Sequence, residues 1–292
     1  MLTDYPLTVS AQPRSEARPF SVDGSGGPLL RGEEEGRGAP LVLVHGLTAT
    51  RRYVLQGSRL LARSGSVRTV TYDARGHGES EPAPDGRYGY GELVADLERV
   101  LEDRGVERCV LAGSSMGAAT ALAFALAHPG RVDALVQITP AYAGHPRTDA
   151  SSLAAWDARA EALEAGDLDS FVSATGVDAL PQRFRDGARM AVRQRVERHR
   201  HPGAVAEALR QVPRSAAFAG MERLAELSMP VLVVGSGDEA DPEHPLEVAR
   251  EYADRIPAAA LITEEPGDPP LAWQGARLSR AIAAFLEDAV HS

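Results

Sequence analysis

Short, continuous runs of apolar residues recur along the chain, each bounded by glycine, proline or a charged residue. Continuous Val, Leu and Ile runs are typical of strands buried on both faces of a parallel sheet, whereas half-buried strands alternate apolar with polar positions. Six runs predict the central strands, at 41–44, 69–72, 109–112, 134–138, 231–234 and 259–262.

Segments with helical spacing lie between several of these runs. Apolar positions in 91–104 form one stripe, and we expect its acidic residues to face away from that stripe. The Ala- and Leu-rich segment 116–128 stops at a Pro-Gly pair, and the segments 245–255 and 276–289 also fit helices. Alternating strands and helices predict an α/β fold, with a mostly parallel central sheet and helices on both faces.

Two stretches interrupt the alternation. Near the start, weak strand candidates at 19–22 and 29–31 flank a glycine-rich turn, which predicts a hairpin. Between 144 and 227 no strand pattern occurs, and the helical candidates there are 152–165, 183–199 and 204–212. We therefore expect a helical lid inserted at 143–227 into a core formed by 1–142 and 228–292.

Composition and charge indicate which classes of binding partner are disfavoured. The 292 residues are 43% hydrophobic and carry a net charge of −10, which suits a globular core and disfavours nucleic acid. No apolar run approaches the roughly 20 residues that cross a bilayer, and the first residues lack the pattern of a secretory signal. We expect a cytoplasmic protein with no membrane partner. The oligomeric state is left open.

Several kinds of chemistry are disfavoured. Every basic residue is arginine, so Schiff-base chemistry through lysine is excluded. The single cysteine, Cys109, lies in an apolar run, where we expect a buried structural thiol. The sequence has no multi-cysteine zinc motif, dinucleotide fingerprint or P-loop, so we expect no metal and no cofactor.

The strongest chemical signal is G-S-S-M-G at 113–117, directly after the run 109–112 and directly before a helical segment. This is the G-x-S-x-G nucleophile elbow in its strand-turn-helix context. Ser115 would occupy a strained turn whose neighbours must be small. The backbone N–H of Met116, at the helix start, would point at the same spot and stabilise an oxyanion.

Two further motifs accompany the elbow: H-G-L at 45–47 and D-A-R-G-H-G-E-S at 73–80. In order and spacing, the three motifs resemble the α/β-hydrolase superfamily. The resemblance implies that Ser115 is the nucleophile and that the amides of Met116 and Leu47 form the oxyanion hole. It also implies that Asp73, Arg75 and His77 belong to a structural turn, and for His45 a hydrogen-bonded turn residue is the favoured interpretation.

In the same family an acidic residue follows the strand that matches 231–234. Asp241, which precedes a proline, fits that pattern best, and Asp238 is the second candidate. Either residue could instead cap the helix expected after Pro245.

The chain departs from the family where the histidine of the triad belongs. The loop after the last predicted strand, 264–275, contains no histidine, and Gly267-Asp268 stands about where Gly-His would. His291 lies beyond the final helix, roughly 20 Å away at 1.5 Å per residue, and so at the opposite end of the sheet. Loss of the base in a serine hydrolase lowers kcat on the order of a millionfold.

Four interpretations remain open. His244 lies in the loop that carries the proposed acid, three residues after Asp241, and could act as base. His145 follows the predicted strand 134–138 at the start of the lid, on the same side of the sheet, and could also act as base. Asp268 could replace the imidazole, although a carboxylate with a pKa near 4 is a weak base unless burial raises that pKa. Finally, there could be no triad at all.

The sequence thus predicts a hydrolase of esters, thioesters or amides with a small, mainly apolar substrate and a relocated base. The alternative is a small-molecule binder or biosynthetic enzyme of the same fold without an acyl-enzyme step. A weaker third possibility is an interaction module that binds its partner through the arginines of the lid. The favoured interpretation of these arginines is a solvated helix face. Trp273, in the loop that lacks histidine, could fill the missing ring's place or stack on a ligand. The arginines are Arg183, Arg185, Arg189, Arg193, Arg195, Arg198 and Arg200.

Overall fold

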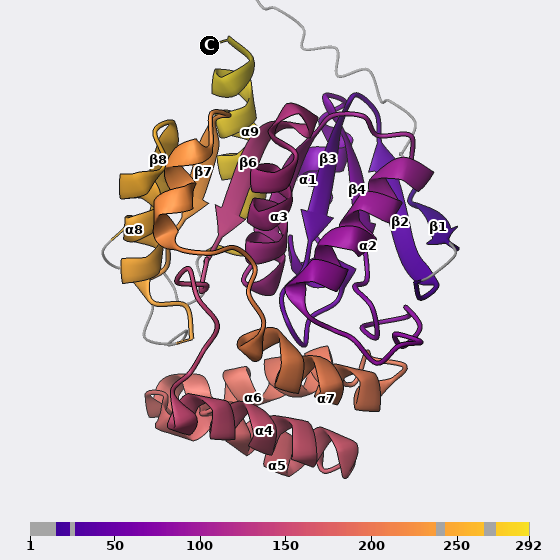
Figure 1. Cartoon of the computed structure of the whole chain (residues 1–292), viewed down its shortest axis with the longest axis vertical. Helices are drawn as coiled ribbons and strands as arrows, with labels where there is room; N and C mark the ends of the chain where they lie inside the picture. The colour runs from indigo at the N-terminus through magenta and orange to yellow at the C-terminus, as the bar shows by residue number, and fades with distance from the viewer. Residues whose placement is uncertain (1–15, 24–26, 238–242, 266–272, 292) are drawn as a thin grey trace, which may run out of the picture.

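The computed structural model describes residues 16–23, 27–237, 243–265 and 273–291. One eight-stranded sheet forms the centre of the molecule, with strand order β1-β2-β4-β3-β5-β6-β7-β8 (Figure 1). The strands are β1 Arg18–Val22, β2 Leu30–Gly36, β3 Ala39–Val44, β4 Val67–Tyr72, β5 Cys109–Ser114, β6 Val132–Ile138, β7 Val231–Val234 and β8 Ala259–Ile262.

The predicted mixture of strand directions is confirmed. Strands β1 and β2 pair antiparallel as the expected hairpin, and β2 pairs antiparallel with β4. From β4 to β8 every pairing is parallel. The carboxyl ends of the parallel strands therefore meet at one edge of the sheet, where loops from β3, β5, β6 and β7 can converge.

Burial follows the apolar runs with one exception. Strands β5 and β7 are buried almost throughout, as a parallel sheet covered on both faces requires. Strand β8 was expected to be equally buried, and this was wrong: its four residues are half-buried or exposed. It is the edge strand, so it has a neighbour on one side only.

Helices cover both faces of the sheet. Side chains of α2, α3 and α8 join one large apolar cluster, and those of α1 and α9 join another on the opposite face. These helices are α1 Leu60–Arg63, α2 Tyr90–Asp103, α3 Met116–Ala127, α8 Leu246–Arg255 and α9 Gly275–His291. Helix α9 ends at His291 rather than before it, and it runs toward the end of the molecule that lies away from α4–α7 (Figure 1).

Residues 139–230 contain helices and no strand. Helices α4 to α7 form a layer below the sheet in Figure 1 and share a small apolar cluster of their own, against which Leu47 of the core also packs. They are α4 Ala150–Glu164, α5 Leu168–Ala174, α6 Gln182–Val196 and α7 Pro202–Gln211. The exact lid bounds 143–227 stay a prediction.

Short 3-10 helices complete the described elements. They are η1 Arg51–Tyr53, η2 Pro129–Arg131, η3 Val177–Ala179, η4 Val212–Arg214 and η5 Met221–Glu226. Among the helices described, none is both long enough and apolar enough to cross a membrane.

Two expectations about single residues have clear outcomes. Cys109 is buried as predicted, and burial raises the pKa of its thiol to about 12, so it is unreactive. Asp96 was expected to face away from the apolar stripe of α2, and this was wrong, because it is fully buried. The guanidinium of Arg75 reaches it there and neutralises its charge.

Candidate active site

Ser115 lies at a sharp turn between β5 and α3. Its backbone has φ 54° and ψ −112°, a left-handed conformation that is strained for a residue with a Cβ. The Ser115 amide donates to the carbonyl of Ile138, 3.1 Å away, which ties the turn to β6. Close packing fixes the turn as well: a Cβ on Gly117 would lie 2.1 Å from the Val44 carbonyl oxygen. The strand-turn-helix geometry of a nucleophile elbow is present.

The loop after β3 approaches the elbow closely. A Cβ on Gly46 would lie 3.3 Å from both the Ser114 carbonyl oxygen and the Ser115 Cβ, so glycine permits the approach. The adjacent Leu47 lines the same cavity as Ser115 and Met116. Met116 is the first residue of α3, where the amide has no acceptor within its own helix. The oxyanion roles of Leu47 and Met116 remain predictions that this placement permits.

His45 braces that loop rather than facing substrate. Its Nδ1 donates to the Gly46 carbonyl, 2.8 Å away, and its Nε2 accepts the amide of Ala74 at 2.9 Å. Both ring nitrogens are therefore used in holding the loop. The interpretation of His45 as a hydrogen-bonded turn residue is confirmed.

Three buried histidines lie in a row where the core meets the lid, with their rings tilted or edge-on to one another. The His77 ring lies 5.3 Å from that of His45 and 5.4 Å from that of His199, centroid to centroid. His199, between α6 and α7, accepts the Gly78 amide and donates to the Thr48 carbonyl. Burial lowers the pKa of His45 to about 4 and the pKa values of His77 and His199 to about 3, so all three are neutral at pH 7.

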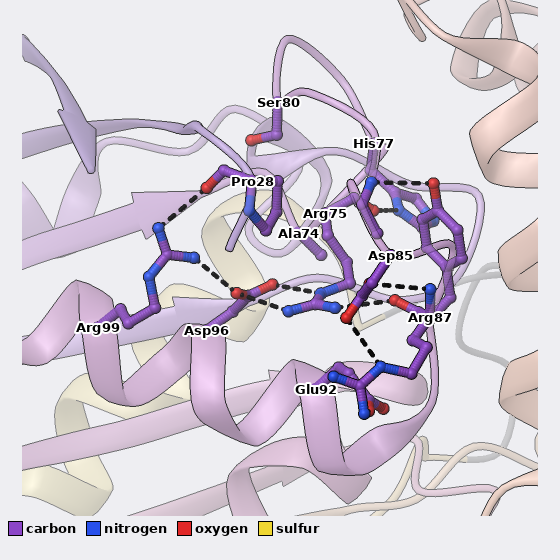
Figure 2. A network of polar contacts seen from close by, with 12 residues as sticks. Pro28, Ala74, Arg75, His77, Ser80, Asp85, Arg87, Glu92, Asp96 and Arg99 are labelled. Atoms are coloured by element: carbon purple, nitrogen blue, oxygen red, sulfur yellow. Dashed lines mark hydrogen bonds and ion pairs between the residues drawn. The ribbon is translucent and has the colours of Figure 1, made fainter. Parts of the chain in front are cut away.

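The turn after β4 is a charge network and is structural, as predicted. Asp73 is buried and accepts the amide and guanidinium of Arg51. Figure 2 shows Arg75 bound side-on to Asp96 of α2, with Nε–Oδ2 2.7 Å and Nη2–Oδ1 2.9 Å, while Arg99 adds a second cation. Each buried carboxylate thus has a guanidinium partner, and the turn is anchored to the helix beside it.

Ser115 opens into a cavity of about 140 Å³ between the sheet edge and the lid. Both histidines that were proposed as the base contribute to the wall of this cavity. His244 is half-buried and His145 is exposed. The His145 Nδ1 donates to the Pro146 carbonyl at 2.9 Å, which leaves a lone pair on Nε2. Within the described residues, the Ser115 hydroxyl makes no hydrogen bond to either histidine.

Asp238, Asp241 and Asp268 lie outside the described residues, so their roles stay predictions. Glu243, next to His244, forms an ion pair with Arg159 of α4 at 2.5 Å. In the portion of the chain that the structure describes, no group of three or more His, Cys, Asp or Glu side chains could hold a metal ion.

A second cavity of about 320 Å³ lies under α6 and shares Glu243 and His244 with the first. Trp273 lines it, and the guanidinium of Arg277 lies 4.8 Å above its ring. Of the lid arginines, Arg189 and Arg193 bind Asp178 and Asp169 at the surface, while Arg195 lines this second cavity.

Sequence reasoning missed several residues that line the Ser115 cavity. Tyr90, at the start of α2, Tyr142 and Arg147, after β6, and Trp156 of α4 all contribute to its wall. No motif marks them, because three separate elements must fold against the elbow before they share a surface.

Comparisons with known proteins agree with this architecture. A family model for the alpha/beta hydrolase fold matches residues 39–276. A thermophilic esterase from Thermogutta terrifontis, solved with malate bound, superposes with a TM-score of 0.76 at 24% identity, covering 94% of this chain and 99% of that one. An enol-lactonase from Burkholderia xenovorans gives a TM-score of 0.69 at 20% identity, covering 91% and 97%. At these identities the structures show the fold alone.

Curated relatives match a shorter stretch. The sn-1-specific diacylglycerol lipase ABHD11 of Mus musculus is 33% identical over 124 residues, which is 42% of this chain and 39% of that protein. The Xenopus laevis protein of the same name is 38% identical over 101 residues, 35% of this chain and 32% of its own length. Because the family model spans most of the sequence and the three motifs lie together in space, the chain belongs to the α/β-hydrolase fold family.

Proposed function

We propose that this protein is a serine hydrolase of small esters, thioesters or amides, in which His244 or His145 supplies the base. The observation that carries the proposal is Ser115, held at a strained elbow and opening into a small cavity that both histidines also line. The sn-1-specific diacylglycerol lipases among the similar proteins support hydrolysis as the reaction class.

The chemistry follows from the placement. Ser115 attacks the substrate carbonyl while the base takes its proton, and the amides of Met116 and Leu47 hold the oxyanion that forms. The base later returns the proton to the leaving group. His145 has the tautomer that this role needs, because its Nδ1 donates to the Pro146 carbonyl. His244 is the closer of the two in sequence to Asp241 and Asp238, the proposed acids.

A fluorophosphonate probe, which reacts only with an activated serine, tests the proposal. We expect the probe to label the folded wild type and not to label Ser115→Ala. One of the two variants His244→Ala and His145→Ala, the one that removes the base, should be labelled at least about a thousandfold more slowly. His128→Ala, at the far end of α3, is the matched control and should label normally. A folded wild type that the probe leaves unlabelled contradicts the proposal.

One observation favours a second candidate, a small-molecule binder of the same fold without an acyl-enzyme step. Among the described residues the Ser115 hydroxyl lacks the hydrogen bond to histidine that an activated nucleophile makes. An unlabelled wild type that still binds a ligand in the Ser115 cavity would support this candidate.

A further inference from the structure

Three tyrosines pack together beside the Ser115 cavity, and two of their hydroxyls have protein partners. The Tyr142 hydroxyl donates to the Phe218 carbonyl, and the Tyr252 hydroxyl donates to the Tyr142 carbonyl, each at 2.8 Å. Tyr90 packs edge-on against Tyr142, with ring centroids 5.7 Å apart. Within the described part of the chain, the Tyr90 hydroxyl donates to no protein group, although Tyr90 is only 7% exposed and lines the cavity.

Arg147, an exposed residue, lines the same cavity. Its amide donates to the Pro213 carbonyl, which fixes the backbone, but its guanidinium makes no hydrogen bond or ion pair with the residues described. Its positive charge acts on Tyr90: burial raises the pKa of Tyr90 strongly, and Arg147 opposes that rise. Tyr90 and Arg147 line the same small cavity, so one ligand bound there can contact both.

Of the nearby acids, Asp149 interacts with Arg147 through charge alone: hydrogen bonds from Ser152 and Ser151, and the charge of Arg147, lower the pKa of Asp149, but no ion pair joins the two side chains. Glu243, in the cavity wall, already forms its ion pair with Arg159. Asp149, two residues along the chain, caps α4 by accepting the amide of Ser152 at 2.7 Å. The wall of the Ser115 cavity thus includes an exposed guanidinium that makes no hydrogen bond or ion pair with the described residues, together with one buried hydroxyl that can donate.

We propose that Arg147 and Tyr90 form a carboxylate-binding site, so that the ester cleaved at Ser115 carries a second, free carboxylate on a short chain. This inference rests on the proposed hydrolase function and names its substrate class. A guanidinium offers two parallel N–H donors that match the two oxygens of a carboxylate, and the tyrosine hydroxyl adds a third donor. The cavity is about 140 Å³, near the ~150 Å³ known to hold benzene, so the chain between the two carbonyl groups must be short.

Binding to the Ser115→Ala protein tests this site without requiring turnover. The probes are monomethyl succinate and methyl succinamate, which have the same shape but differ in one charge. Ligand-observed NMR titration measures both dissociation constants. We expect monomethyl succinate to bind at least about tenfold more tightly, as a charge-assisted contact implies.

Second-site variants in the same background locate the preference. Arg147→Gln and Tyr90→Phe should each reduce the preference, with Arg147→Gln bringing the two dissociation constants together. Arg280→Gln, an exposed arginine of α9, is the matched control and should leave the preference unchanged. Circular dichroism confirms that each variant is folded.

Equal affinity for the two probes, a preference that survives Arg147→Gln, or binding of neither probe would overturn the inference. These outcomes are separate from the proposed function, which the fluorophosphonate probe decides. A labelled wild type whose Ser115→Ala form does not distinguish the probes is a hydrolase of another substrate class. An unlabelled wild type whose Ser115→Ala form prefers monomethyl succinate is a binder of short carboxylates.

Discussion

At the scale of the residue, Ser115 shows why the glycines around it are required. A non-glycine residue at φ 54° stores on the order of 1–3 kcal/mol of strain. That strain persists only if the surrounding contacts hold the turn, and they do so by close backbone approach. Gly117 lets α3 start against the end of β3, and Gly46 lets the facing loop reach the elbow.

Gly117→Ala is expected to destabilise the protein severely. The added Cβ would lie 2.1 Å from the Val44 carbonyl oxygen, and backbone cannot move aside as a flexible side chain can. The loss in free energy of unfolding should reach or exceed the ~1–3 kcal/mol typical of overpacking. Urea unfolding measures it. Gly130→Ala, beyond the other end of α3 where a Cβ meets nothing within 4 Å, is the control. Equal stability of the two variants would refute the packing argument.

At the scale of the element, the position of helix α2 depends on a buried charge as well as on its apolar stripe. Leu93, Leu97 and Val100 enter the core as the spacing predicts, and Asp96 enters with them. Burying a carboxylate is unfavourable unless a cation accompanies it. Arg75 provides that cation from the turn after β4, so turn and helix must assemble together (Figure 2).

Removing one member of this pair should be strongly destabilising. Asp96→Ala leaves the Arg75 guanidinium buried without its main acceptor, and we expect a loss of about 3–5 kcal/mol in the free energy of unfolding. The control is Glu98→Ala on the same helix, whose side chain is partly exposed and whose carboxylate lies 3.7 Å from Arg131. That control should change stability by less than about 1 kcal/mol. Similar losses of unfolding free energy in both variants would show that the buried Arg75–Asp96 pair contributes no more to stability than an ion pair at the surface.

The row of buried histidines makes stability depend on pH. His45, His77 and His199 have pKa values of about 3 to 4 in the folded protein, below the ordinary value of 6.5. The unfolded chain therefore binds protons more readily, and the stabilisation, complete above pH 6.5, is lost as the pH falls toward 3. Each histidine contributes a slope of up to about 1.4 kcal/mol per pH unit within that window.

His77→Leu isolates one of these contributions. Free energies of unfolding in urea, measured from pH 7 to pH 4, should fall less steeply in the variant than in the wild type. Carboxylates titrate in both proteins, so the difference between the two curves reports on His77. Parallel curves would show that His77 is not neutral and buried in the folded state.

At the scale of the whole molecule, the candidate site lies between the sheet edge and the helical layer, and both contribute residues to it. Ser115 comes from the core, Trp156 from α4, and the Glu243–His244 pair from the loop after β7. The ion pair of Arg159 with Glu243 connects α4 to that loop, directly beside one of the candidate bases.

Glu243→Gln tests whether this connection positions the site. Glu243 is partly exposed but its partner Arg159 is buried, so we expect a loss of about 1–3 kcal/mol in the free energy of unfolding. If His244 is the base, labelling of Ser115 by the fluorophosphonate should slow by about tenfold or more, because a small displacement of a catalytic group lowers the reaction rate strongly. Asp157→Asn, which removes another α4 ion pair, with Arg214, should label at the wild-type rate. Normal labelling of Glu243→Gln would remove this positioning role.

The sequence by itself determined the parallel core, the terminal hairpin, the helical stretch between β6 and β7 and the elbow at Ser115. These depend on local signals: apolar periodicity, turn glycines and short motifs that each fit within one strand-turn-helix unit. Only the tertiary structure decided that β8 is an exposed edge, that Asp96 is buried, and that Tyr90, Arg147 and Trp156 share the Ser115 cavity. The reason is physical: exposure and charge pairing are properties of neighbours brought together by folding, and residues distant along the chain carry no local sign of that proximity.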